Sequence, residues 1–271
     1  MMTPRDLALI NRLIYYDPPD NTLKRIGCCL SAGMMAEEII AHPPQCADFT
    51  RDDADSLKPV LSNCAIRDLI IAGYINHNDS NGFVAFAFEG GDETVLAFRG
   101  SESAPGCVVS NVDWVDNILS PFNRSIQYRD VERFINNYKV GPLVTTGHSK
   151  GGHNALYSIA VAENESARCV AFDAQGFSSG QLDSRQKRRL KHRCVNYVYR
   201  RDVVGALLCH PEKRVFVKGS KLVDPHSLDA LAFDVNGDPI AAKQAVIPHL
   251  IGLGTCALPL PLFDTRQAQP E

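Results

Sequence analysis

The sequence predicts an α/β fold, in which helices flank a mostly parallel central sheet. The chain has 271 residues, of which 45% are hydrophobic and 22% are charged, and this composition is typical of a globular protein. From residue 131 onward, short β-rich runs alternate with helical patterns. Such alternation favours parallel strands joined by crossover helices, so we expect both faces of the sheet to be covered.

Residues 1–80 are predicted to be mainly helical. Apolar residues recur at helical spacing over residues 7–16, and an Asp-Pro-Pro-Asp sequence at 17–20 ends that segment. A second helix is expected over residues 27–40 and a third over residues 57–74. Charged side chains interrupt the first apolar stretch, so we interpret it as a helix and not as a signal peptide.

A β-hairpin is predicted next, with strands at residues 82–88 and 94–98 around a turn that contains Gly90 and Gly91. Further along the chain, β-rich runs predict strands at residues 142–146, 169–172, 195–199 and 214–217. Helices are predicted before and between these strands, at residues 131–138, 152–162 and 184–192.

The end of the chain is apolar. Several Pro and Gly residues interrupt residues 249–263, so this tail is expected to be packed loop. We expect one domain over residues 1–271, with a helical N-terminal elaboration at 1–80, a core at 82–235 and an apolar C-terminal extension at 236–271.

The charge balance excludes some function classes. A formal net charge of -3 and a pI near 6.2 leave no global electrostatic footprint for nucleic acid, so no nucleic-acid partner is expected. Residues 185–193 are rich in Lys and Arg, but these go round the whole predicted helix and lack interleaved aromatic residues. This pattern favours a solvated surface helix over a contact with anionic lipid. No apolar run is long enough for a transmembrane helix.

The cysteines are scattered along the chain, and no CxxC pair occurs, which argues against a zinc site. Several lie in apolar runs, such as Cys169 and Cys194, where a thiol behaves as a small hydrophobic group. Since no signal peptide is predicted, we expect reduced, mostly structural thiols in a cytoplasmic protein, with leaderless export of a bacterial effector as the alternative. No metal or other cofactor is implied.

The most informative segment runs through Gly147, Ser149 and Gly151, which form a G-x-S-x-G motif between a predicted strand and a predicted helix. In an α/β-hydrolase this motif is a sharp turn with the nucleophilic serine exposed at its apex. The two glycines lack the β-carbons that would clash there. The amide of Lys150 then lies at a helix N-terminus, where it can bind an oxyanion. A glycine-rich turn without chemistry is the alternative.

A serine nucleophile needs a base, and the base needs an orienting carboxylate. In α/β-hydrolases the acid follows the serine along the chain. Asp173 and Asp202 each follow a predicted strand, and both strand ends are expected at the sheet edge that carries Ser149. Asp202 is preferred because it lies one strand further along.

The base is expected to be a histidine that follows the acid. His226 is preferred because it lies in a loop before a predicted helix, and His249 is the runner-up. His210 leaves little chain to return over the serine, and His192 lies in the basic helix.

Three motifs in this order resemble the class 3 (fungal-type) lipase-like group of α/β-hydrolases. They are Phe98-Arg99-Gly100-Ser101, Asp113-Trp114-Val115-Asp116-Asn117 and Gly147-His148-Ser149-Lys150-Gly151-Gly152. The third motif, followed by Phe172-Asp173-Ala174-Gln175-Gly176-Phe177, resembles a bacterial branch of that group.

The resemblance implies an ester hydrolase with Ser149, Asp202 and His226 as the triad, and with the amides of Ser101 and Lys150 as oxyanion donors. It points to a lipid ester, acylglycerol or phospholipid, as the substrate at a membrane surface. A small-ester or thioester hydrolase is the alternative within enzymes, and a non-catalytic binding protein with a hydrolase fold is the alternative outside them. Residues 102–125 are rich in apolar side chains, including Trp114, and are interpreted either as a lid or as a core helix.

Overall fold

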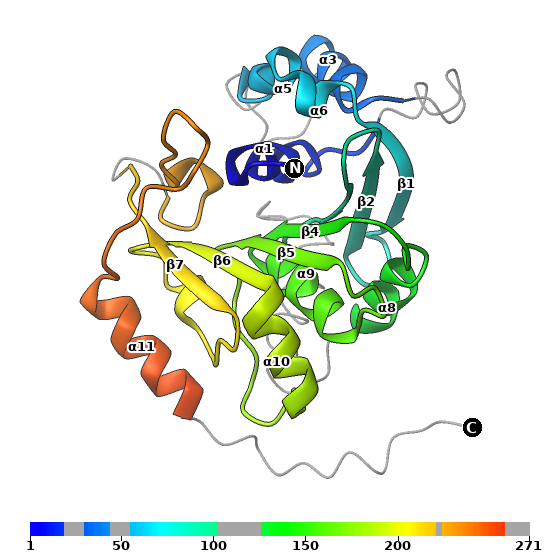
Figure 1. Cartoon of the computed structure of the whole chain (residues 1–271). Helices are drawn as coiled ribbons and strands as arrows, with labels where there is room; N and C mark the ends of the chain where they lie inside the picture. Colours follow the sequence, from blue (N-terminus) through cyan, green and yellow to red (C-terminus); the bar gives the residue numbers. More distant parts are fainter. Residues whose placement is uncertain (19–29, 44–54, 102–125, 221–223, 258–271) are drawn as a thin grey trace.

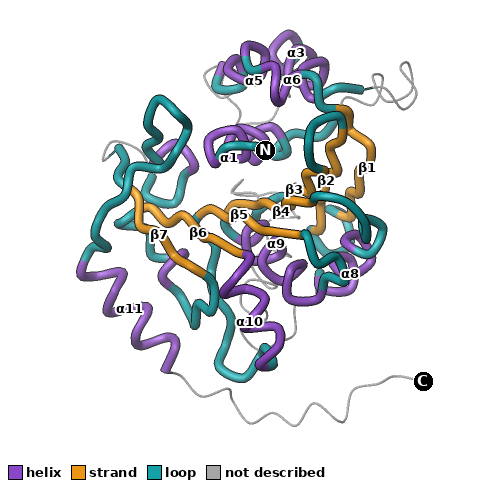
Figure 2. The backbone as a smooth tube through the Cα atoms, in the orientation of Figure 1, coloured by secondary structure: helices purple, strands orange, loops and turns teal. Residues whose placement is uncertain are grey.

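The computed structural model describes residues 1–18, 30–43, 55–101, 126–220 and 224–257. Its centre is a seven-stranded sheet whose strands follow one another in chain order, from β1 to β7 (Figures 1 and 2). β1, β2 and β3 pair antiparallel, and β3 to β7 pair parallel. The mostly parallel sheet and the predicted hairpin of β2 and β3 are therefore confirmed.

The strands are β1 Ile70–His77, β2 Phe83–Glu89, β3 Thr94–Phe98, β4 Leu143–His148, β5 Ala167–Phe172, β6 Cys194–Tyr199 and β7 Lys213–Val217. The α-helices of the described residues are α1 Pro4–Leu13, α3 Ala32–Ala41, α5 Lys58–Ser62, α6 Cys64–Arg67, α8 Tyr128–Ile135, α9 Lys150–Val161, α10 Ser184–Arg193 and α11 Val246–Ala257. Two 3-10 helices, η2 Val204–Ala206 and η3 Leu228–Ala230, follow β6 and β7.

Both faces of the sheet are buried. Successive side chains of a strand point to opposite faces, so one strand contributes to two cores. In β2, Phe86 and Phe88 pack into the cluster that contains α1 and α3, whereas Ala85 and Ala87 pack into the cluster that contains α8 and α9. Figure 1 shows α1, α3, α5 and α6 on one side of the sheet and α8, α9 and α10 on the other.

The expected third helix over residues 57–74 is wrong beyond Arg67. The Asn63 side chain accepts a hydrogen bond from the amide of Ala65, so the segment breaks into the short helices α5 and α6 at that residue. The chain then forms β1, which pairs with β2 along its length. Antiparallel pairing with the neighbouring strand β2 overrode the local helical pattern, and residues 1–80 are therefore not wholly helical.

The loop expected over residues 249–263 is wrong for residues 249–257, which belong to the helix α11. Pro248 lies in the first turn of this helix. A backbone N–H at that position would have no intrahelical acceptor, so a proline there costs no hydrogen bond. Gly252 lies against the loop after β6, where a β-carbon would come within 2.5 Å of the Ala206 carbonyl oxygen. The remainder of the predicted loop, residues 258–263, lies outside the described residues.

A disulfide joins Cys209 to Cys256, so the expectation of reduced thiols is wrong for this pair. The fold brings their Cα atoms to 4.9 Å although 47 positions separate them in the chain, and sequence spacing does not show such proximity. Cys169 and Cys194 are free and buried, as expected, and Cys64 is free and exposed. Over the described part of the chain, no helix is both long and apolar enough to cross a membrane.

Candidate active site

Ser149 lies at the sharp turn between β4 and α9. Its backbone has φ 57° and ψ -126°, a conformation that residues other than glycine rarely adopt. The turn requires glycine on both sides, since a β-carbon on Gly147 would come within 2.2 Å of the Gly151 carbonyl carbon, and one on Gly151 within 2.1 Å of the Phe98 carbonyl oxygen. A serine at such a turn above a mostly parallel sheet is the arrangement of the α/β-hydrolase fold.

The structure brings the three preferred residues together from distant parts of the chain. His226 Nε2 lies 2.7 Å from Ser149 Oγ, and His226 Nδ1 lies 3.0 Å from Asp202 Oδ1. The Asp202 carboxylate accepts a hydrogen bond from the Nδ1–H of His226, so Nε2 is left free to accept the serine hydroxyl proton. These contacts have the geometry of a nucleophile, a general base and an orienting acid.

Asp202 is held by the chain that follows it. Its side chain is 2% exposed, and its oxygens accept hydrogen bonds from the amides of Val204 at 3.2 Å and Gly205 at 2.5 Å. Gly205 is required because a β-carbon there would lie 2.9 Å from Asp202 Oδ2. Backbone donors stabilise negative charge on the carboxylate and orient it toward His226.

Asp173, the alternative acid, lies beside Asp202 and not opposite the base. It is fully buried, with φ 46°, and its Oδ1 accepts a hydrogen bond from the amide of Tyr199 at 2.7 Å. Burial, and then the neighbouring charge of Asp202, raise the pKa of Asp173 well above its usual range. A neutral Asp173 can donate a hydrogen bond to the Asp202 carboxylate.

The other candidate histidines lie elsewhere. His249 is on the exposed surface of α11, with Nδ1 3.3 Å from Gln244 Oε1. The buried His210 contacts Glu212 at 2.6 Å and the Leu207 carbonyl oxygen at 2.9 Å. His192 is exposed at the end of α10. None of these three is the hydrogen-bond partner of Ser149.

His148, a buried residue whose role the sequence analysis missed, contacts the backbone of the candidate base His226. Its Nε2 lies 2.7 Å from the backbone carbonyl oxygen of His226, and its Nδ1 lies 3.0 Å from the Tyr15 hydroxyl oxygen. Burial lowers the pKa of His148 to about 3, so the ring is neutral at pH 7. A carbonyl oxygen only accepts, so Nε2 carries the proton and Tyr15 donates to Nδ1.

The two predicted oxyanion donors belong to segments that meet at the turn. Lys150 is the first residue of α9, and its side chain is buried. Ser101 follows Gly100, where a β-carbon would lie 2.7 Å from the His148 carbonyl oxygen. The end of the Ser101 segment therefore lies against the turn, and the roles of both amides remain predictions. The suggested lid at residues 102–125, with Trp114, lies outside the described residues.

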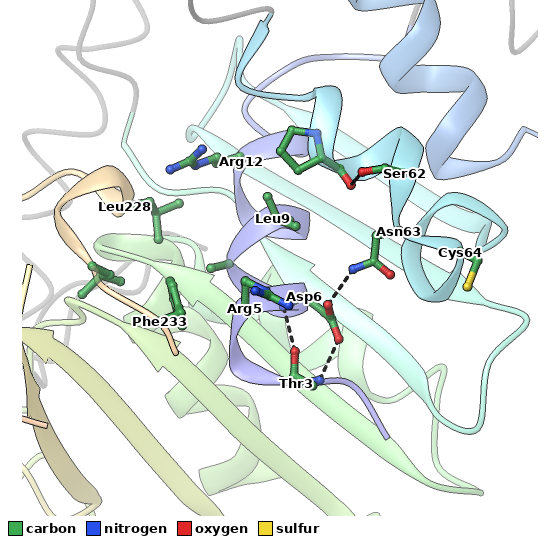
Figure 3. A pocket seen from close by; sticks show the side chains of 13 residues that line it. Thr3, Arg5, Asp6, Leu9, Arg12, Ser62, Asn63, Cys64, Leu228 and Phe233 are labelled. Carbon is green, nitrogen blue, oxygen red and sulfur yellow. Dashed lines mark hydrogen bonds between the residues drawn. The ribbon is translucent and has the colours of Figure 1, made fainter. Parts of the chain in front are cut away.

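A cavity of about 710 Å³ lies between α1, the α5–α6 segment and residues 228–233 (Figure 3). Leu228, Leu231 and Phe233 supply apolar lining, and Leu228 is two positions from His226. Part of the polar lining already has hydrogen-bond partners, because Asp6 accepts hydrogen bonds from Thr3 and Asn63. Arg12 forms an ion pair with Asp229, directly after Leu228. The cavity therefore borders the loop that holds the base.

In the described segments, no three or more His, Cys, Asp or Glu residues form a group that could hold a metal ion. The chemistry that the site can perform with the residues present is proton transfer and nucleophilic attack by a hydroxyl.

Comparisons with known proteins gave one family and several solved structures. The model of the Mbeg1-like family matches residues 58–245. No curated protein matches the chain. A mutant form of MDLA from Penicillium cyclopium is similar at 13% identity and a TM-score of 0.48, over 92% of this chain and 93% of that chain. The triacylglyceride lipase of Rhizomucor miehei is similar at 13% identity and a TM-score of 0.41, over 92% of this chain and 93% of that chain.

Proposed function

The chain belongs to the Mbeg1-like family, a lipase-like family, and from this premise and the geometry around Ser149 we propose that it is a serine ester hydrolase that acts on lipid esters. The observation that carries the proposal is the continuous contact from Ser149 through His226 to Asp202, at 2.7 Å and 3.0 Å. Family membership agrees with the lipase-like resemblance that the sequence motifs predict.

In the proposed reaction, Ser149 Oγ attacks the ester carbonyl carbon while His226 Nε2 takes the hydroxyl proton. Asp202 stabilises the imidazolium that forms. The amides of Ser101 and Lys150 donate to the oxyanion of the tetrahedral intermediate. His226 returns the proton to the leaving alcohol, which leaves an acyl group on Ser149. Water, deprotonated by the same imidazole, then attacks the acyl-enzyme and releases the carboxylic acid and the free serine.

The lipid substrate class is supported by the lipase-like family. A small ester or a thioester would undergo the same chemistry at the same serine, and a non-catalytic binding protein would not need the aligned proton acceptor at His226. The paired contacts of His226 therefore favour an enzyme over a binding protein.

Labelling with a fluorophosphonate probe tests this function. We expect the probe to attach covalently to Ser149, as located by mass spectrometry, and the Ser149→Ala protein to remain unlabelled. Acylglycerol, phospholipid, short-chain ester and thioester substrates, each assayed for released acid, then identify the substrate class. A folded protein that neither reacts with the probe nor hydrolyses any of these substrates would favour the binding protein.

A further inference from the structure

One side of α11 presents apolar side chains to solvent. Val246 is 73% exposed, Ile247 70%, Leu250 60% and Leu253 59%. Positions separated by three or four residues share one side of a helix, so these four side chains form a continuous strip, the α11 strip. No Asp, Glu, Lys or Arg occurs within this helix. Exposed apolar patches of this kind mark interaction sites.

The opposite side of α11 is fixed to the loop after β6. Gly252 lies against Ala206, and Thr255 Oγ1 accepts a hydrogen bond from the amide of Leu208 at 2.9 Å. The disulfide between Cys209 and Cys256 holds the same end of the helix. Figure 1 shows α11 at the β7 edge of the molecule, away from α1 and α3. The strip is thus the outer side of a helix whose inner side already has its partners.

The chain around α11 is basic. Arg200 lies at the start of the helix, where its carbonyl oxygen accepts from the amide of Ala245 at 2.9 Å. Arg200, Arg201 and Lys243 are all exposed. Within residues 199–218 and 239–257 the acids are Asp202 and Glu212, and both are buried, at 2% and 6% exposure. The surface that surrounds the strip therefore carries positive charge with no exposed carboxylate from these segments.

The inner side of α11 packs close to the residues that follow the proposed catalytic acid. Val203, which follows Asp202 directly, is 40% exposed. The next residues form η2, on which α11 packs.

We propose that the α11 strip, with Arg200, Arg201 and Lys243 around it, is a docking surface for an anionic lipid bilayer. An apolar helix face enters the boundary between headgroups and acyl chains, and cationic side chains at its rim attract anionic headgroups. The link from docking to catalysis rests on the proposed function, because a lipid ester has to be reached at such a surface. The proposal adds to that function the part of the molecule to which the bilayer binds.

Sedimentation of the full chain with vesicles tests the proposal. The wild type is expected to bind vesicles of mixed phosphatidylcholine and phosphatidylglycerol, and to bind pure phosphatidylcholine vesicles more weakly. The double variant Leu250→Gln with Leu253→Gln should lose at least about tenfold in vesicle affinity, because two apolar side chains no longer enter the bilayer. Lys243→Glu should weaken binding to the anionic vesicles only.

A matched control uses two apolar residues that are exposed elsewhere. Val140 is 93% exposed and Val235 is 90% exposed, so Val140→Gln with Val235→Gln makes the same chemical change away from the strip. This control should bind vesicles as the wild type does. All variants should keep the wild-type melting temperature and hydrolyse a soluble short-chain ester at the wild-type rate, because the substituted side chains are exposed.

Wild-type protein that does not bind anionic vesicles, or a double variant that binds them equally well, overturns the proposal. A wild-type dimer in light scattering that becomes monomeric in the double variant, without a change in vesicle binding, assigns the strip to a second copy of the chain. Vesicle binding that depends on the strip, in a protein that hydrolyses no ester, leaves the docking surface standing and refutes the proposed function.

Discussion

Two buried histidines flank Ser149, one on each side of the sheet, and their surroundings are chemically alike. His148 contacts the Tyr15 hydroxyl at 3.0 Å and a backbone carbonyl oxygen at 2.7 Å. His153, one helical turn after Ser149, contacts the Tyr128 hydroxyl at 2.7 Å and a backbone carbonyl oxygen at 3.3 Å. Burial lowers the pKa of His148 to about 3 and that of His153 to about 4.

The two histidines differ in the backbone carbonyl oxygen to which each donates a hydrogen bond. His148 donates to the carbonyl of His226, the proposed base, whereas His153 donates to the carbonyl of Gln175. Tyr15 follows α1, and Tyr128 begins α8. The same pair of residue types thus connects the N-terminal helix to the proposed chemistry on one side of the sheet. On the other side it joins α8 to the loop after β5.

Substitution of the proposed nucleophile should have the largest effect on activity. Ser149→Ala should lower kcat by about a million-fold, because no other hydroxyl is held by His226. Ester hydrolysis measures the loss, and an unchanged melting temperature shows that both histidine contacts survive. A variant that keeps a tenth of the activity would contradict the role of Ser149.

The two buried carboxyl groups should differ greatly. Asp202→Asn should lower kcat by about ten-thousand-fold, because an amide favours the wrong tautomer of His226. Asp173→Asn should cost far less, because an amide can replace the neutral acid as a donor to Asp202. The two variants, assayed side by side, give this order, and the reverse order would make Asp173 the acid.

Two matched variants, each lacking one tyrosine hydroxyl, compare the contributions of Tyr15 and Tyr128 to kcat and to stability. Tyr15→Phe should lower kcat by about tenfold, because His148 loses the donor that fixes its tautomer and its hold on His226 loosens. Tyr128→Phe should leave kcat unchanged. Both variants should lower the free energy of unfolding by about 1–2 kcal/mol, as measured in urea.

Equal kcat values for the two tyrosine variants, with equal losses of stability, would show that the Tyr15 contact stabilises the fold and has no effect on catalysis. Wild-type kcat in the Tyr15→Phe protein, together with a wild-type pH profile, would lead to the same conclusion.

Both histidines should weaken the fold in acid, an effect on stability and not on kcat. In the unfolded chain a histidine titrates near about 6.5, so between that pH and the lowered folded pKa the unfolded chain binds more protons. The free energy of unfolding should therefore fall as the pH falls from about 6.5, by up to about 1.4 kcal/mol per pH unit for each histidine. His153→Gln should flatten this slope in urea unfolding at several pH values. An unchanged slope would show that His153 contributes nothing to it.

The sequence alone determined the features that depend on neighbouring residues. The strand-to-helix turn at Ser149 follows from Gly147 and Gly151, since no side chain fits at either position. The strands β2 to β7 and the helices α9 and α10 follow from short apolar runs and from helical spacing. Asp202 and His226 were preferred from their positions after a strand and before a helix, and the structure places both beside Ser149.

Only the tertiary structure decided the features that depend on residues far apart in the chain. α11 lies where Ala206 and Cys209 meet its inner side, and the disulfide there joins cysteines that are 47 positions apart. The contact of Tyr15 with His148 spans 133 positions. Local propensity carries no information about such pairs, because their energy appears only when the folded sheet brings both partners out of water and into hydrogen-bond distance.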